Sequence, residues 1–249
     1  MTTARELEGS VALVTGGAKN IGRAIVLELA EAGAHVVVLT RSDASAADNV
    51  AARAREHGVE AEVCLADVTD EAAVQRAFAE VRKRFGRLDV LVNNAAIRKE
   101  RPFAGMELAE WREILGVTLD GAFLCARAAL PMLLESGHGA IVNIGGLTAY
   151  TGAIERAHVV TAKAGLGGLT RALATELAAQ SVTVNLVAPG LIDTARDGPR
   201  PQHHRTSTAL VGRAGTPGEI AAIVRYLAGP RARFVTGQTL HVNGGAYLG

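Results

Sequence analysis

The stretch VALVTGGAKNIG, residues 11–22, decides the fold, because an apolar run passes through adjacent glycines directly into a helical pattern. Residues 11–14 predict a short buried strand, and residues 23–32 predict the helix that follows it. Gly16 and Gly17 allow a tight turn and a close approach of the backbone to a ligand. The helix start would present free N–H groups to an anion. Because this glycine turn lies between a predicted strand and a predicted helix, it indicates a binding site for the phosphates of a dinucleotide.

The composition favours a soluble, intracellular protein with a small-molecule ligand. The chain has 249 residues, 49% of them hydrophobic, and a formal net charge of +1. The near-neutral charge and the lack of long basic or acidic runs argue against nucleic acid or a membrane as partner. Cys64 and Cys125 are too few for a disulfide framework, which predicts a cytoplasmic location. We expect no signal peptide and no run long enough to span a membrane.

A second buried strand is predicted over residues 34–40, and the two residues after it bear on the choice of cofactor. Arg41 and Ser42 follow this strand, at the place where the adenosine ribose lies in dinucleotide-binding folds. A guanidinium matches a 2′-phosphate in charge and shape, and Lys19 in the glycine turn can reach the same group. The pair favours NADP(H) over NAD(H). The alternative is that both are solvated surface cations.

Strands and helices continue to alternate along the chain. We expect helices over 45–57 and 71–85, with strands over 61–65 and 88–92. Asp67, just past the third strand, can accept a hydrogen bond from the adenine amino group. Alternatively, Asp67 or Thr69 caps the helix that begins near Asp70, and both roles are compatible.

The second half repeats the alternation and closes the predicted sheet. A long helix is predicted over 111–134 with an interruption near Pro131, and Lys163 lies in a later helix that ends near residue 180. Strands are expected over 139–144, over 183–187 and within 235–245. The pattern predicts one α/β domain over 1–249, a Rossmann-type, doubly wound parallel sheet of about seven strands. Residues 195–212 are polar and aperiodic and predict a lid over the substrate; they include His203 and His204, for which no metal role is expected.

Several motifs together resemble the short-chain dehydrogenase/reductase family, in particular its members similar to 3-oxoacyl-acyl-carrier-protein reductases. They are the glycine turn, Asp67 after the third strand and Asn-Asn-Ala at 93–95 after the fourth. Asn20 and Ala96 replace family glycines, and Asn tolerates a left-handed backbone. The resemblance implies a homodimer or homotetramer. Combined with the residue patterns, it implies that the cofactor is held by Gly16, Lys19, Asn20, Ile21, Gly22, Arg41, Ser42, Asp67, Val68, Asn93, Ala95, Lys163, Pro189, Gly190, Ile192 and Thr194.

The family's catalytic pattern is incomplete in this sequence. Ketone-reducing members use a Ser, a Tyr, a Lys four residues after the Tyr, and an Asn on an earlier helix. Counting back from Lys163 puts Val159 at the Tyr position and Gly146 at the Ser position, and Thr118 falls at the Asn. Glycine and valine carry no proton donor, so the family's usual ketone mechanism cannot run unaltered.

Three explanations of this pattern remain open. The donor has moved to Tyr150 or His158, with Thr148 a weaker candidate, unless these side chains only pack or cap. Alternatively, the substrate is an iminium cation, whose reduction needs no acid. The third explanation is a cofactor-binding protein without hydride transfer, such as a sensor or a silent subunit. We favour an NADP(H)-dependent oxidoreductase acting on a small carbonyl, alcohol or imine, with Lys163 holding the ribose.

Overall fold

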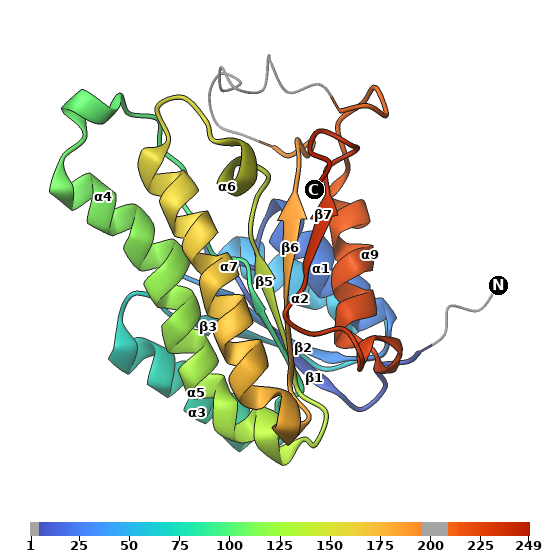
Figure 1. The fold of residues 1–249 in the computed structure, drawn as a ribbon. Helices are drawn as coiled ribbons and strands as arrows, with labels where there is room; N and C mark the ends of the chain where they lie inside the picture. The colour runs from blue at the N-terminus through green and yellow to red at the C-terminus, as the bar shows by residue number, and fades with distance from the viewer. Residues whose placement is uncertain (1–4, 196–208) are drawn as a thin grey trace.

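The computed structural model describes residues 5–195 and 209–249, and within them the predicted parallel sheet is present. Seven strands pair in parallel in the order β3-β2-β1-β4-β5-β6-β7 (Figure 1). This order confirms the doubly wound α/β architecture. The strands are β1 (Val11–Thr15), β2 (His35–Thr40), β3 (Ala61–Leu65), β4 (Val90–Asn93), β5 (Ala140–Ile144), β6 (Thr183–Pro189) and β7 (Thr239–Val242).

Helices cover both faces of the sheet (Figure 1). On one face, α1 (Asn20–Glu31), α2 (Ala44–Arg55) and α9 (Pro217–Ala228) enclose one hydrophobic core. On the other face, α3 (Glu71–Phe85), α5 (Gly121–Glu135) and α7 (Ala157–Leu177) enclose a second core. The remaining helical segments are α4 (Leu108–Leu115), α6 (Thr148–Thr151), the 3-10 turns Phe103–Gly105, Ala178–Gln180 and Pro230–Ala232, and a π turn at Gly116–Asp120.

The sequence explains why the central strands lie inside. All five residues of β1 and β5 are buried, as expected for apolar runs covered by helices on both faces. The chain leaves β1 toward β2 on one side and reaches β4 on the other, so the strand order reverses between β1 and β4. Ligands of such sheets bind at the carboxyl ends of the strands near that reversal. The site is therefore to be sought above β1 and β4.

The helix predicted over 111–134 is interrupted at a different position from the one we expected. Pro131 lies inside α5 without ending it, so the predicted interruption there is wrong. Pro131 cannot donate a hydrogen bond to the carbonyl of Arg127, and both residues lie on the exposed side of α5. The irregularity is instead the π turn at Gly116–Asp120, which holds Thr118. Such turns occur often at functional sites.

Two further expectations about surfaces can be compared with the structure. The helical stretch Leu108–Glu135 is long and apolar enough to cross a membrane by length and composition alone, contrary to our expectation for this chain. Core helices of soluble proteins meet the same criterion, and the buried side of α5 packs in the second core.

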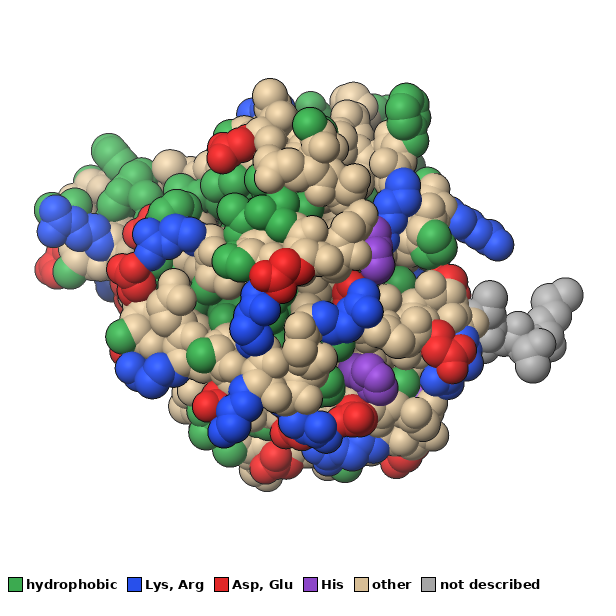
Figure 2. Space-filling model, turned by 90° about the horizontal axis from the view of Figure 1, so that it is seen from below, with side chains coloured by type: hydrophobic (Ala, Val, Ile, Leu, Met, Phe, Trp, Pro, Cys, Tyr) green, Lys and Arg blue, Asp and Glu red, His purple; other side chains and the backbone are tan. Residues whose placement is uncertain are grey.

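Figure 2 shows positive and negative side chains interspersed on the face seen from below. Residues 196–208 of the predicted lid, with His203 and His204, lie outside the described residues.

Candidate cofactor and active site

A cavity of about 1070 Å³ lies at the carboxyl ends of the central strands. Its walls come from the β1–α1 turn, from the segments after β4, β5 and β6, and from the start of α7. Eleven of the predicted site residues line it: Gly16, Lys19, Asn20, Ile21, Gly22, Ala95, Lys163, Pro189, Gly190, Ile192 and Thr194.

The glycine turn is held in a conformation that excludes side chains. Gly16 has a φ of +64°, and a Cβ atom on Gly22 would lie 2.1 Å from the Gly16 carbonyl oxygen. Asn94 fixes the turn, because its Nδ2 donates hydrogen bonds to the carbonyl oxygens of Thr15 and Gly16, both at 3.0 Å. Asn20 has a φ of 50°, the left-handed conformation that Asn tolerates. The backbone is thus shaped for close approach to a ligand.

The start of α1 differs from the starts of α2, α3 and α9, whereas α5 and α7 resemble α1 in having no side-chain cap. The cap residue of α1, Lys19, makes no side-chain hydrogen bond to the first turn. By contrast, Asp43, Asp70 and Thr216 accept such bonds at the starts of α2, α3 and α9. The backbone N–H groups of the first turn of α1 therefore face the cavity without a side-chain acceptor. This arrangement fits the phosphates of a dinucleotide.

The ribose end of the site lies beside β2 and β3. Arg41 and Ser42 are exposed after β2 and do not line the cavity, which reaches Lys19. Burial opposes ionisation of Asp67, but hydrogen bonds from Thr69 and the charge of Arg41 outweigh it and lower the Asp67 pKa. The alternative that Asp67 or Thr69 caps the next helix is wrong, because the cap of α3 is Asp70, which accepts from the Ala73 N–H at 3.0 Å.

Asn93 supports the centre of the sheet from within. Its side chain is buried and donates to Asn143 Oδ1 at 2.9 Å, and Asn143 donates to Thr170 Oγ1 at 2.9 Å. These bonds join β4, β5 and α7. Asn93 and Val68 do not line the cavity. The structure therefore shows a scaffolding role for Asn93, while Ala95 lies at the cavity wall.

Lys163, Val159 and Gly146 meet at one end of the cavity. Lys163 Nζ is buried and donates a hydrogen bond to the Ile144 carbonyl oxygen at 2.6 Å. Burial, and to a lesser extent the charge of Arg98, lowers the pKa of the Lys163 ammonium to about 7. Val159 lies one turn earlier on α7, and a Cβ atom added to Gly146 would meet nothing within 4 Å. The space beside Lys163 is open at Gly146.

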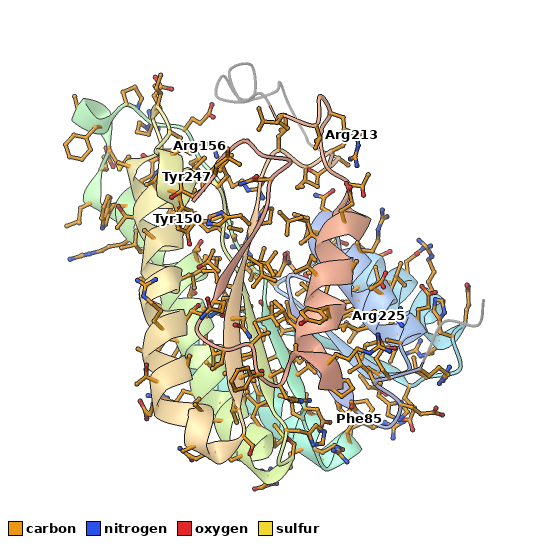
Figure 3. The ribbon with its side chains drawn as sticks, turned by 45° about the vertical axis from the view of Figure 1, so that its right-hand side comes forward. Phe85, Tyr150, Arg156, Arg213, Arg225 and Tyr247 are labelled. Carbon is orange, nitrogen blue, oxygen red and sulfur yellow. The ribbon has the colours of Figure 1, made fainter. Side chains whose placement is uncertain are left out.

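The structure does not bring Tyr150 and His158 together with Lys163. The Tyr150 hydroxyl donates to Thr239 Oγ1 at 3.1 Å, and its ring lies 4.5 Å from that of His241. Figure 3 shows Tyr150 beside Tyr247 near the upper end of α7. His158 is fully buried, and neither of its ring nitrogens has a hydrogen-bond partner among the described residues. Both side chains lie outside the cavity walls, since Tyr150 turns toward β7 and the His158 ring is enclosed.

Several charged wall residues were not anticipated from the sequence. Arg98, Glu100 and Arg156 line the cavity on the side away from the glycine turn. Arg156 is buried and forms an ion pair with Glu100, with Nε 3.2 Å from Oε1. These residues come from the segment after β4 and the start of α7. In the sequence they are marked only by position, since Arg98 and Glu100 follow a strand and Arg156 precedes a helix.

Comparisons with known proteins agree with this geometry. A family model described as enoyl-(acyl carrier protein) reductase matches residues 16–247. The 3-oxoacyl-(acyl-carrier-protein) reductases FabG of Aquifex aeolicus and Escherichia coli are 37% and 36% identical, over 97% of this chain and 99% and 98% of theirs.

Two solved structures share the fold across nearly the whole chain. A short chain dehydrogenase from Burkholderia cenocepacia, crystallised in complex with NADP, has a TM-score of 0.91 at 33% identity and covers 97% of this chain and 99% of its own. A protein from Sinorhizobium meliloti that is described as a short-chain alcohol dehydrogenase has a TM-score of 0.92 at 34% identity, and the match covers 98% of both chains.

Proposed function

The chain belongs to the short-chain dehydrogenase/reductase family, and from this premise we propose that it is an NADP(H)-dependent oxidoreductase of small organic carbonyl compounds or alcohols with a non-standard catalytic centre. One observation carries the proposal. A single cavity connects the uncapped start of α1 with the buried ammonium of Lys163. A dinucleotide with its phosphates at α1 and its nicotinamide toward Lys163 would span that distance.

The preference for NADP(H) is supported by the two cations at the ribose end. Lys19 and Arg41 lie on the adjoining β1–α1 and β2–α2 segments, where a 2′-phosphate would lie between them. The relative from Burkholderia cenocepacia was crystallised with NADP. Ser42, Asp67 and Val68 complete the proposed adenosine end, while Pro189, Gly190, Ile192 and Thr194 would border the nicotinamide.

We propose that Gly146 and Val159 stand where ketone-reducing relatives carry Ser and Tyr, and that Lys163 itself delivers the proton. NADPH, when bound, would supply a hydride to the carbonyl carbon. As the C=O π bond breaks, its electron pair on oxygen would take a proton from Lys163 Nζ and leave a neutral amine. Lys163 lines the open space beside Gly146, and a pKa of about 7 suits an acid at neutral pH.

An imine substrate is supported less well than a carbonyl compound. The apolar Val159 would suit an iminium cation, which needs no acid. However, Arg98 lines the same cavity, and its charge disfavours the protonated form of Lys163. The same field would oppose a cationic substrate, whereas it would stabilise the negative charge that develops on a carbonyl oxygen.

The experiment offers NADPH with small ketones, 3-oxoacyl thioesters and cyclic iminium compounds in parallel, and follows NADPH absorbance. We expect oxidation of NADPH with at least one carbonyl compound. Calorimetry of NADPH binding is the companion measurement. Turnover of iminium compounds alone would contradict the carbonyl assignment. Tight binding without any turnover would instead identify a cofactor-binding protein without hydride transfer.

A further inference from the structure

We propose that Asp43 weakens NADP(H) binding because it forms an ion pair with Lys19. Asp43 would thereby reduce the ratio of NADP(H) affinity to NAD(H) affinity. This inference rests on the proposed function. Its basis is an ion pair across the ribose end of the site, in which Lys19 Nζ lies 2.5 Å from Asp43 Oδ2. Lys19 begins α1 and Asp43 begins α2, so the pair joins the two turns between which a 2′-phosphate would bind.

The Asp43 carboxylate is fixed by the cap of α2, and most of the Lys19 side chain is exposed to solvent. The second oxygen of Asp43 accepts a hydrogen bond from the Ala46 N–H at 3.1 Å, which caps α2. Lys19 has a long side chain that is 67% exposed. When a phosphate arrives, Lys19 can turn toward it, whereas Asp43 stays where the cap holds it.

Charge decides the direction of the effect. The hydrogen bond from Lys19, followed by that from Ala46, lowers the pKa of Asp43, so its carboxylate is ionised at neutral pH. A 2′-phosphate would therefore meet two cations, Lys19 and Arg41, and one nearby anion. It must compete with Asp43 for Lys19. The 2′-hydroxyl of NAD(H) carries no charge and can donate a hydrogen bond to a carboxylate, so Asp43 does not oppose it.

The test is Asp43→Asn, because asparagine keeps the helix cap and removes the charge. We expect NADPH to bind about 1.5- to 5-fold more tightly at low salt, the range for releasing an exposed ion pair, with NADH binding unchanged or weaker. Fluorescence titration gives both dissociation constants. Asp48→Asn is the matched control, since Asp48 is exposed on the same helix and its loss changes the net charge equally. It should leave the NADPH to NADH ratio unchanged.

A second variant asks whether Asp43 acts through Lys19. In a Lys19→Met background, the gain from Asp43→Asn should shrink, and high salt should reduce the gain in the parent chain. An Asp43→Asn chain that binds both cofactors like the parent, or binds NADPH more weakly, would overturn the inference and leave the proposed function intact. A parent chain that binds neither dinucleotide would refute the proposed function itself.

Discussion

At the scale of single residues, the proton chemistry proposed for the site centres on Lys163, whose pKa of about 7 results from burial first and from Arg98 second. If its ammonium is the acid, reduction requires the protonated form. We therefore expect kcat/KM for carbonyl reduction to be constant below pH 7 and to fall about tenfold per pH unit above it. Lys163→Arg should remove that fall, because arginine stays charged. A profile that is flat from pH 6 to 9 in the parent chain would contradict this role.

Val159 and Gly146 offer a second test at the residue scale. Both line the cavity beside Lys163, so serine and tyrosine hydroxyls at these positions would reach the same space. We expect Gly146→Ser with Val159→Tyr to raise ketone reduction by roughly 10²- to 10⁴-fold, the usual contribution of a positioned general acid. Steady-state rates with NADPH provide the measurement. The control is Val160→Tyr, because the next helix position points about 100° away. An equal gain in both variants would exclude a specific effect.

At the scale of elements, the β1–α1 turn depends on the absence of a side chain at Gly22. A Cβ atom there would lie 2.1 Å from the Gly16 carbonyl oxygen and 2.6 Å from Asn94 Nδ2. Gly22→Ala must therefore displace the turn, and we expect NADPH affinity to fall by at least about tenfold, because the N–H groups that face the phosphates move. Titration of NADPH checks this. Gly218→Ala adds the same atom to α9 in ordinary contact, at 3.8 Å from Thr216 Oγ1, and should leave affinity unchanged.

The start of α9 gives a second prediction at the scale of elements. Thr216 and Glu219 form a reciprocal capping box, and α9 lies in the same core as α1. Removal of one cap bond by Thr216→Ala should lower the free energy of unfolding by about 0.5–2 kcal/mol. Urea denaturation measures this change. Thr216→Ser keeps the acceptor oxygen and should retain most of the stability. Equal losses in both variants would show that the methyl group matters instead.

At the scale of the whole molecule, the sequence predicts the sheet well and the far wall of the cavity poorly. Short runs rich in β-branched Val and Ile fit strands of a sheet that is covered on both faces, which makes the strands easy to locate. The π turn at Gly116–Asp120 has no such marker, because its hydrogen bonds depend on packing between α4, α5 and α7. The family resemblance places Tyr150, four residues after Gly146, in a loop that borders the substrate. Tyr150 packs on His241 and Tyr247, contacts made between segments far apart in sequence.

The assembly of the molecule is the last property that the surface allows us to predict. We propose a homodimer or homotetramer that buries the outer sides of α5 and α7. Phe123 of α5 is 46% exposed, with the Arg127 guanidinium 5.4 Å from its ring centre, and the exposed positions Ala164 and Gly168 of α7 are small enough for close helix contact. Phe123→Asp should place a charge in that contact and shift the mass measured by light scattering toward the monomer. Phe234→Asp, at a fully exposed ring outside these helices, is the control and should leave the mass unchanged. If the parent chain is itself monomeric, the outer faces of α5 and α7 are solvent surfaces and the cavity functions within one chain.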